Sequence, residues 1–377
     1  MAEKVLYLEG LRGLAAFTVF LGHFFPLYIR IPVLLTFAYI GRNFSICVFF
    51  VLSGFVLTYA FFRTGQHETL VSGAVRRYIR LLVPILFVLV LVYVLIYPGP
   101  EDLLDIRAFT MMISQAFWGV FLQGQSAYLP DVEDYTGVLW TITIEFIGSF
   151  IVFSFAALFG QLRNRWVFYL AALALFLNTY FLAFILGMIL ADGYTNKFFT
   201  QFRFKTPWIL LPIGVVVAAS AAYPVAIFGE LLNYGMAELA AIFTTTGPFA
   251  ATTLFQIGGN VPVEDFFHII GAVALLFLIL NYERMQLVLS STVPVFLGKI
   301  SFSLYLIHMV VILTFSIFMM SVFFDNPADP ANGTIVLVFT IPILFLLSYL
   351  MYLYIDKPGT VLAKKIYARY FSRENTS

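Results

Sequence analysis

The chain has 377 residues, of which 62% are apolar and 11% are charged, whereas ordinary soluble domains have about 45–50% and about 25%. A soluble protein is excluded, and so are a disordered chain and a β-barrel, because disorder needs low hydrophobicity and barrel strands dilute their apolar residues by alternation. The net charge of +1 provides no broad basic surface for nucleic acid, and the single cysteine, Cys47, excludes an intramolecular disulfide framework and a multi-cysteine metal site.

Nine long apolar stretches follow one another along the chain. Each has 16 to 26 residues, close to the roughly 20 that a helix needs to cross hydrocarbon. Together they contain one charged side chain, Glu145. We therefore predict an all-α, polytopic membrane protein. In chain order the stretches are residues 13–29, 43–62, 81–97, 137–159, 166–191, 208–228, 266–281, 300–324 and 334–355.

The loops between these stretches indicate the orientation of the chain. Residues 63–80 contain four arginines and one glutamate, whereas residues 98–136 contain six acidic residues and one arginine. The positive-inside rule places the first loop in the cytoplasm, and counting crossings places both termini there as well. Both termini on one side require an even number of crossings. We therefore interpret residues 166–191 as a hairpin with legs 166–177 and 180–191.

The prediction is thus a helical bundle of about ten transmembrane helices that forms a single domain over residues 1–377. The hairpin turns near Asn178, where the apolar stretch is interrupted. Residues 234–260 are apolar but rich in threonine and glycine, and we interpret them as a surface or re-entrant element.

Arg12 and His23 belong to the first predicted helix. Eleven residues separate them, which corresponds to three turns plus 20°, so they share a face about 16 Å apart along the axis. This spacing suits one extended ligand, with the guanidinium at the cytoplasmic rim and the imidazole deeper inside. The alternative is an arginine whose charge reaches the interface and a hydrogen-bonded core histidine.

Glu145 is the one charge inside a predicted span, where an ionisable group costs about 2.5–3.5 kcal/mol on insertion scales. Thr141 lies four residues earlier on the same helix face, and Trp140 lies beside that face. A carboxylate at this depth has to pair with a cation or become neutral, and a histidine is a natural partner. We expect Glu145 to orient His23 as a general base. A structural glutamate is the alternative.

Ser301, Tyr305 and His308 recur at i, i+4 and i+7 and form a polar stripe in the ninth stretch. The stripe predicts either a hydrogen-bond network between helices or a wall of the substrate site. His268 lies near the outer end of its stretch, and we interpret it as an ordinary interfacial histidine.

Arg76, Arg77 and Arg80 precede the third stretch at helical spacings of three and four residues. If the helix begins early, their guanidinium groups converge and can bind phosphate. The alternative is that they act only as an orientation signal.

Taken in order, these segments resemble the membrane acyltransferase-three family, integral-membrane enzymes that O-acylate sugars and other small molecules. The resemblance covers nearly the whole chain and implies ten helices. It rests on Leu8–Ala16 followed by His23, Phe49–Phe55, Arg76–Arg80 leading to Pro84, Trp140–Glu145, Leu297–His308 and Asp356–Pro358.

The chain departs from the family pattern in two places. Phe146 replaces the usual second acidic residue after the tryptophan motif, and Thr141 replaces the motif's serine but keeps a hydroxyl. The Glu-Phe form resembles the fungal branch. Because the chain ends soon after its last span, we expect it to lack the extracytoplasmic hydrolase-like domain of some relatives.

The resemblance predicts transfer of an acyl group, with acetyl as the first choice, from acyl-coenzyme A to a hydroxyl or amine of a small molecule or glycan. Arg76, Arg77, Arg80 and Arg12 are expected to bind the coenzyme A phosphates, and His23, Glu145 and Arg12 to form the catalytic set. We expect direct transfer, because Ser53 and Cys47 lie in no recognisable nucleophile setting. The residues expected to contact substrate are Trp140, Thr141, Ser53, Ser301, Tyr305 and His308.

We expect no permanently bound cofactor, no metal and no nucleic acid, and a location in the endomembrane system or the plasma membrane. The bilayer itself is a partner, and a homo-oligomer is left open. The alternative function is a proton-coupled secondary transporter that uses His23, Glu145 and His308 as a relay. A scaffolding protein explains neither the Arg12–His23 pair nor Glu145.

Overall fold

The computed structural model describes residues 5–96, 106–122, 133–177, 179–198, 261, 263–324, 326 and 329–371. Over these residues the chain is helical and contains no strand, which confirms the all-α class. The predicted span 208–228, the element at 234–260 and the turn residue Asn178 lie outside the described residues.

The first three helices are long and closely spaced in sequence. They are α1 (Leu6–Tyr28), α2 (Pro32–Thr64) and α3 (Glu68–Ile96). Helix α2 begins with Pro32, whose fixed φ suits a first turn, and stops at Gly65, whose φ of 70° is left-handed. It is longer than the apolar stretch 43–62, so Arg42 lies inside the helix.

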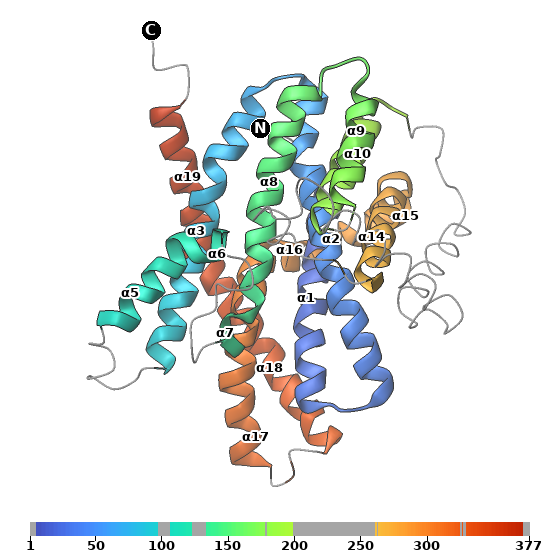
Figure 1. The fold of residues 1–377 in the computed structure, drawn as a ribbon. Helices are drawn as coiled ribbons and strands as arrows, with labels where there is room; N and C mark the ends of the chain where they lie inside the picture. The colour runs from blue at the N-terminus through green and yellow to red at the C-terminus, as the bar shows by residue number, and fades with distance from the viewer. Residues whose placement is uncertain are drawn as a thin grey trace, which may run out of the picture.

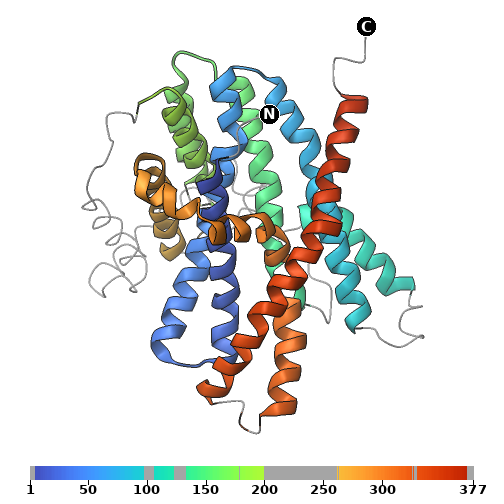
Figure 2. The ribbon, with the colours of Figure 1, turned by 180° about the vertical axis from the view of Figure 1, so that it is seen from behind.

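The middle of the chain combines short helices with one full span. Its helices are α5 (Ile106–Ser114), the π-helix η1 (Gln115–Gly119), α6 (Val120–Leu122), α7 (Glu133–Thr136), the 3₁₀-helix η3 (Gly137–Leu139) and α8 (Trp140–Phe159). Two shorter helices follow, α9 (Arg165–Phe176) and α10 (Phe181–Thr195), which overlap the two legs expected of the hairpin. They lie side by side in Figures 1 and 2.

The last third contains a sharp bend and two long helices. Helices α14 (Val263–Asn281) and α15 (Glu283–Leu289) meet at an angle of 99°. The remaining elements are α16 (Thr292–Val311), η6 (Ile312–Ser316), α17 (Ile317–Phe323), α18 (Pro330–Met351), η7 (Tyr352–Asp356) and α19 (Lys357–Tyr370). Helices α18 to α19 continue as one helix of 41 residues, which crosses the face shown in Figure 2.

Six helices of the described chain are long and apolar enough to cross a membrane, or seven if α14 and α15 count as one bent span. Three shorter apolar helices, at Phe109–Leu122, Arg165–Phe176 and Phe181–Thr195, accompany them. An integral membrane protein follows from these lengths and compositions. The predicted count of ten includes residues 208–228, which the structure does not describe, so that count stays a prediction.

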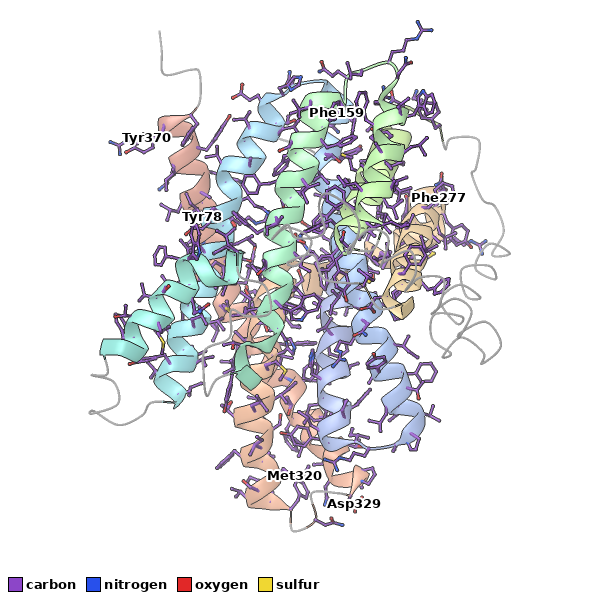
Figure 3. All side chains as sticks on the ribbon, viewed as in Figure 1. Tyr78, Phe159, Phe277, Met320, Asp329 and Tyr370 are labelled. Carbon is purple, nitrogen blue, oxygen red and sulfur yellow. The ribbon has the colours of Figure 1, made fainter. Side chains whose placement is uncertain are left out.

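Five of the connections and chain ends mark two opposite ends of the bundle. The α2–α3 connection, the α8–α9 connection and the end of α19 share one end, whereas the α1–α2 and α17–α18 connections share the other (Figure 1). Phe159 and Tyr370 mark the first end and Asp329 marks the second (Figure 3). The segments predicted to be cytoplasmic therefore lie together, and the assignment of their end to the cytoplasm stays a prediction.

Glycines set the distance between the central helices. Helix α1 packs against α2 and α16, and a Cβ at Gly13 would lie 2.3 Å from the backbone nitrogen of Gly298 on α16. Similarly, a Cβ at Gly54 on α2 would lie 2.1 Å from the carbonyl oxygen of Phe184 on α10. Such backbone contact is typical of membrane helices that meet at small residues. It places Arg12 and Ser53, the neighbours of these glycines, at the centre of the bundle.

Candidate active site

A cavity of about 330 Å³ lies between α1, α2, α3, α8 and α16. Its residues on α1 and α3 belong to the first half of each helix, and those on α2 lie between Ile46 and Ala60. On α8 the lining residues belong to the first two turns, whereas Phe159 ends that helix, so the cavity lies in the interior of the bundle (Figure 3). Six of the predicted site residues line it besides Arg77 and Arg80, namely Arg12, Ser53, Thr141, Glu145, Ser301 and Tyr305.

Charged side chains are concentrated on the wall of this cavity, although the chain has few of them. The cationic ones are Arg12, Arg77, Arg80 and Lys299, and the acidic ones are Glu9, Glu145 and Asp356. Most other lining residues are apolar, among them Phe49, Phe50 and Phe302. The cavity therefore offers cationic groups and an apolar wall to the same ligand.

Glu145 is held by neighbours other than a histidine. Its Oε1 ion-pairs with the guanidinium of Arg77 on α3, and it also accepts a 2.7 Å hydrogen bond from the hydroxyl of Ser53 on α2. The expectation that Glu145 orients His23 is therefore wrong. Helix packing places an arginine against the carboxylate, and an arginine neutralises and hydrogen-bonds a buried carboxylate better than a neutral imidazole does.

Arg12 and Arg80 contrast with Arg77. Neither has a hydrogen bond or an ion pair with another described residue. The charge of Glu9 is within electrostatic range of Arg12, and those of Asp356 and Glu145 are within range of both arginines. The Nε of Arg12 is buried without a partner. A buried donor without a partner is costly, so Arg12 favours an anion in the cavity. Arg80 is exposed and adds a second guanidinium on the same wall.

Arg76 does not join the other two arginines of its motif. Its Nε donates a 2.8 Å hydrogen bond to the carbonyl oxygen of Ser72, and its guanidinium lies 5.9 Å from the ring centre of Tyr367 on α19. The expected convergence of three arginines is thus wrong for Arg76. Neighbouring residues on a helix point about 100° apart, so Arg77 faces the cavity while Arg76 faces α19.

The polar stripe on α16 forms hydrogen bonds and lines the cavity as well. The Tyr305 hydroxyl lies 2.7 Å from the Thr141 hydroxyl and donates a 3.1 Å hydrogen bond to the carbonyl oxygen of Val138. Ser301 donates a 2.9 Å hydrogen bond to the carbonyl oxygen of Gly298. Tyr305 thus forms hydrogen bonds between helices, and Ser301 and Tyr305 also belong to the cavity wall. That this wall contacts substrate stays a prediction.

His23 and His308 meet each other beyond the cavity wall. The Nε2 of His308 lies 3.3 Å from the Nδ1 of His23, and the ring centres are 5.0 Å apart. Neither ring lines the cavity. The Tyr305 ring, which does, is 5.7 Å from the His308 ring between centres. Tyr305 therefore links the cavity wall to the histidine pair. Arg12 lines the cavity and His23 lies beyond its wall, so the two residues do not share one open site in this structure.

Trp140 packs away from the cavity. Its ring centre lies 5.4 Å from that of Tyr180 on α10, and Trp140 is not part of the cavity wall. The prediction that it contacts substrate there is not supported by this geometry. The reason is its position one residue before Thr141, which turns it about 100° around the axis of α8.

His268 is buried among protein side chains. It is 1% exposed, and its Nδ1 lies 3.0 Å from Oδ1 of Asp265. Asp265 also accepts a hydrogen bond from the Tyr180 hydroxyl. The Nε2 of His268 is buried without a hydrogen-bond partner. Its position relative to the membrane interface stays a prediction.

Three further residues join the site although the sequence did not single them out. Lys299 and Asp356 line the cavity. Both belong to the segments Leu297–His308 and Asp356–Pro358 on which the resemblance rests, so the sequence could have indicated them. Asp356 ends the π-helix η7, and such bulges shift the register of a helix, frequently at functional sites. Arg42 stands beside the histidine pair, since a Cβ at Gly22 would lie 2.6 Å from its Cβ.

Among the described residues no group of three or more histidine, cysteine, aspartate or glutamate side chains is arranged to hold a metal ion. A comparison with protein-family models matches residues 5–353 to the acyltransferase-3 model, described as an acyltransferase domain. No curated protein and no solved structure shows significant similarity to the chain.

Proposed function

Because the matched region covers nearly the whole chain, the protein belongs to the acyltransferase-three family of membrane proteins, and we propose that it transfers an acyl group from acyl-coenzyme A to an acceptor. The acceptor is a hydroxyl or amine of a small molecule or glycan, and acetyl is the simplest acyl group. The main support is the cavity itself. Its wall contains two guanidinium groups without an ion-pair partner, Arg12 and Arg80, and it contains Tyr305, whose ring contacts that of His308.

The donor's phosphates bind at the cationic side of the cavity in this proposal. Arg12 and Arg80 are the main contacts because their donors are uncommitted, and a guanidinium binds phosphate in a two-pronged geometry. Lys299 adds a third positive charge on the same wall. Arg77 contributes mainly by holding Glu145, since its guanidinium is already paired.

His23 is the general base. As the acceptor's oxygen bonds to the thioester carbonyl carbon, its proton moves to His23; the carbon–sulfur bond then breaks, and the departing thiolate takes that proton as coenzyme A. A neutral imidazole suits this exchange because its ordinary pKa is near physiological pH. The pantetheine arm runs from Arg12 along α1 toward Tyr305, and a displacement of the Tyr305 ring gives the thioester access to His23.

The transporter alternative requires His23, Glu145 and His308 to act as one relay. The histidines contact each other, but the Glu145 carboxylate is engaged by Arg77 and Ser53. The family assignment also favours acyl transfer.

The test is incubation of the purified protein with labelled acetyl-coenzyme A and a cell extract, followed by isolation of labelled product. The wild type is expected to form product. His23→Ala is expected to lose at least about 10²-fold in rate, the lower range of what general-base catalysis contributes. Ser303→Ala is the matched control, because its buried hydroxyl on α16 has no hydrogen-bond partner. An active His23→Ala protein would refute the assignment, and proton-coupled uptake insensitive to acyl-coenzyme A would favour the transporter.

A further inference from the structure

The hydrogen-bond partners of His308 select one tautomer of its ring. Its side chain is fully buried, and its Nδ1 lies 2.7 Å from the carbonyl oxygen of Tyr305. A carbonyl oxygen only accepts hydrogen bonds, so the hydrogen of this bond is on Nδ1. A neutral imidazole carries one such hydrogen, and the Nε2 of His308 is therefore an acceptor.

The acceptor nitrogen of His308 faces His23. The Nδ1 of His23 lies 3.3 Å from it and 3.0 Å from the carbonyl oxygen of Val19. Both neighbours accept hydrogen bonds, so the Nδ1 of His23 carries the hydrogen. The Nε2 of His23 is then the nitrogen with a free electron pair, which is the form that removes a proton from an acceptor.

We propose that His308 is the positioning residue of His23, the role that sequence reasoning assigned to Glu145. It orients the imidazole with Nε2 unprotonated, and it receives a stronger hydrogen bond from Nδ1 when His23 gains a proton during transfer. His308 itself neither gains nor loses a proton, because its Nδ1–H stays on the Tyr305 carbonyl oxygen. This inference rests on the proposed function, since it concerns the base of that reaction.

The pair is held in register on both sides along α1. Gly13 contacts Gly298 in the cavity half, and the Tyr28 hydroxyl donates a 3.0 Å hydrogen bond to the carbonyl oxygen of Ile312 in the other half. Ile312 begins the π-helix η6 directly after the helix that carries His308. A π-helix leaves carbonyl groups with altered partners and is frequent at functional sites. The two contacts fix α16 against α1 where the rings meet.

The charged group that faces this pair from α2 is Arg42. Its Nε donates a 3.3 Å hydrogen bond to the side-chain oxygen of Asn43, and its guanidinium lies 5.5 Å from the ring centre of Tyr39. No carboxylate of the described residues pairs with it or with His23. Within the part of the chain that the structure describes, His308 is therefore the side chain that hydrogen-bonds the base.

The first test reads the tautomer directly. The chain contains four histidines, so ¹⁵N-histidine labelling gives a spectrum that His→Gln variants can assign. We expect His23 in the resting protein to be protonated at Nδ1 and unprotonated at Nε2, and this signal to change in His308→Leu but not in Ser303→Ala. The opposite tautomer in the wild type, or an unchanged signal in His308→Leu, would overturn the inference whether or not transfer is detected.

The second test is kinetic and uses labelled acetyl-coenzyme A with the acceptor identified from the labelled product of the acyl-transfer experiment. His308→Leu is expected to lower kcat by about 10²-fold, as removal of general-base assistance does, with KM for acetyl-coenzyme A within about 2-fold, because the cavity is untouched. His308→Gln keeps an acceptor oxygen and is expected to recover most of the rate. Full activity in His308→Leu would refute the role of His308, and so would no recovery in His308→Gln when its melting temperature is unchanged. The proposed function is tested separately, by the activity of His23→Ala.

Discussion

Arg77 on α3 and Glu145 on α8 form an ion pair between residues 68 positions apart in sequence. Both side chains are largely buried, with exposures of 8% and 18%, and both line the cavity. The pair ties two helices together at the site and leaves Arg12 and Arg80 as the uncommitted guanidinium groups.

Breaking this pair on one side should destabilise the protein more than removing it altogether. Loss of one partner of a buried pair costs about 3–5 kcal/mol, because the other charge stays buried and unpaired. We therefore expect Arg77→Met and Glu145→Gln each to lower the thermal midpoint in detergent, and the double variant to regain part of the loss. A double-mutant cycle on denaturation midpoints measures the coupling, and strictly additive effects would contradict the pair.

Substitution of Arg12 or Arg80 by glutamine should weaken binding of the donor's nucleotide part. A charge-assisted hydrogen bond contributes about 1.5–3 kcal/mol, so we expect KM for acetyl-coenzyme A to rise about 10-fold or more. KM for acetyl-pantetheine, which lacks the nucleotide phosphates, should change little. The control is Arg76→Gln, because that arginine is on the same helix turn but faces α19. An equal effect of all three substitutions would place the phosphates elsewhere.

The contact between Gly13 and Gly298 should not tolerate a side chain. A Cβ at Gly13 would lie 2.3 Å from a backbone nitrogen of α16, and overpacking of this kind costs about 1–3 kcal/mol. Gly13→Ala is therefore expected to lower the thermal midpoint and the yield of folded protein. Gly137→Ala is the matched control, since nothing lies within 4 Å of a Cβ there. Equal stability of both variants would show that α1 and α16 are farther apart at Gly13 than in this structure.

The Thr141 hydroxyl should matter through its bond with Tyr305. Thr141→Ser keeps this hydroxyl and is expected to keep stability, whereas Thr141→Val should lose about 0.5–1.5 kcal/mol, the net contribution of a hydrogen bond. Chemical denaturation in detergent measures both. In the Tyr305→Phe background the cost of Thr141→Val should shrink, and an undiminished cost there would mean that the two hydroxyls do not interact.

The orientation can be tested with introduced cysteines, because Cys47 is the one native cysteine and is buried. In a Cys47→Ala background, Arg163→Cys places a single thiol in the α8–α9 connection and Arg30→Cys places one in the α1–α2 connection. These two connections lie at opposite ends of the bundle (Figure 1). We expect a membrane-impermeant thiol reagent applied to the outside of intact cells to label position 30 and to leave position 163 unlabelled. The reverse pattern would invert the predicted topology.

The apolar spans could be predicted because hydrocarbon excludes charge, which is a property of each segment by itself. The same local reasoning selected Thr141, Glu145 and Tyr305, which line the cavity, whereas Ser53 was selected by the family resemblance. Polar groups within an apolar helix have to face protein or water. This holds whatever the neighbouring helix turns out to be.

Only the tertiary structure decided which of these groups meet. Glu145 pairs with Arg77, and His23 meets His308, because the rotation and depth of each helix are set by contacts between distant segments such as Gly13 and Gly298. Arg76 and Trp140 face away for the same reason. The sequence by itself determined which side chains the membrane would force inward, and packing between helices determined their partners.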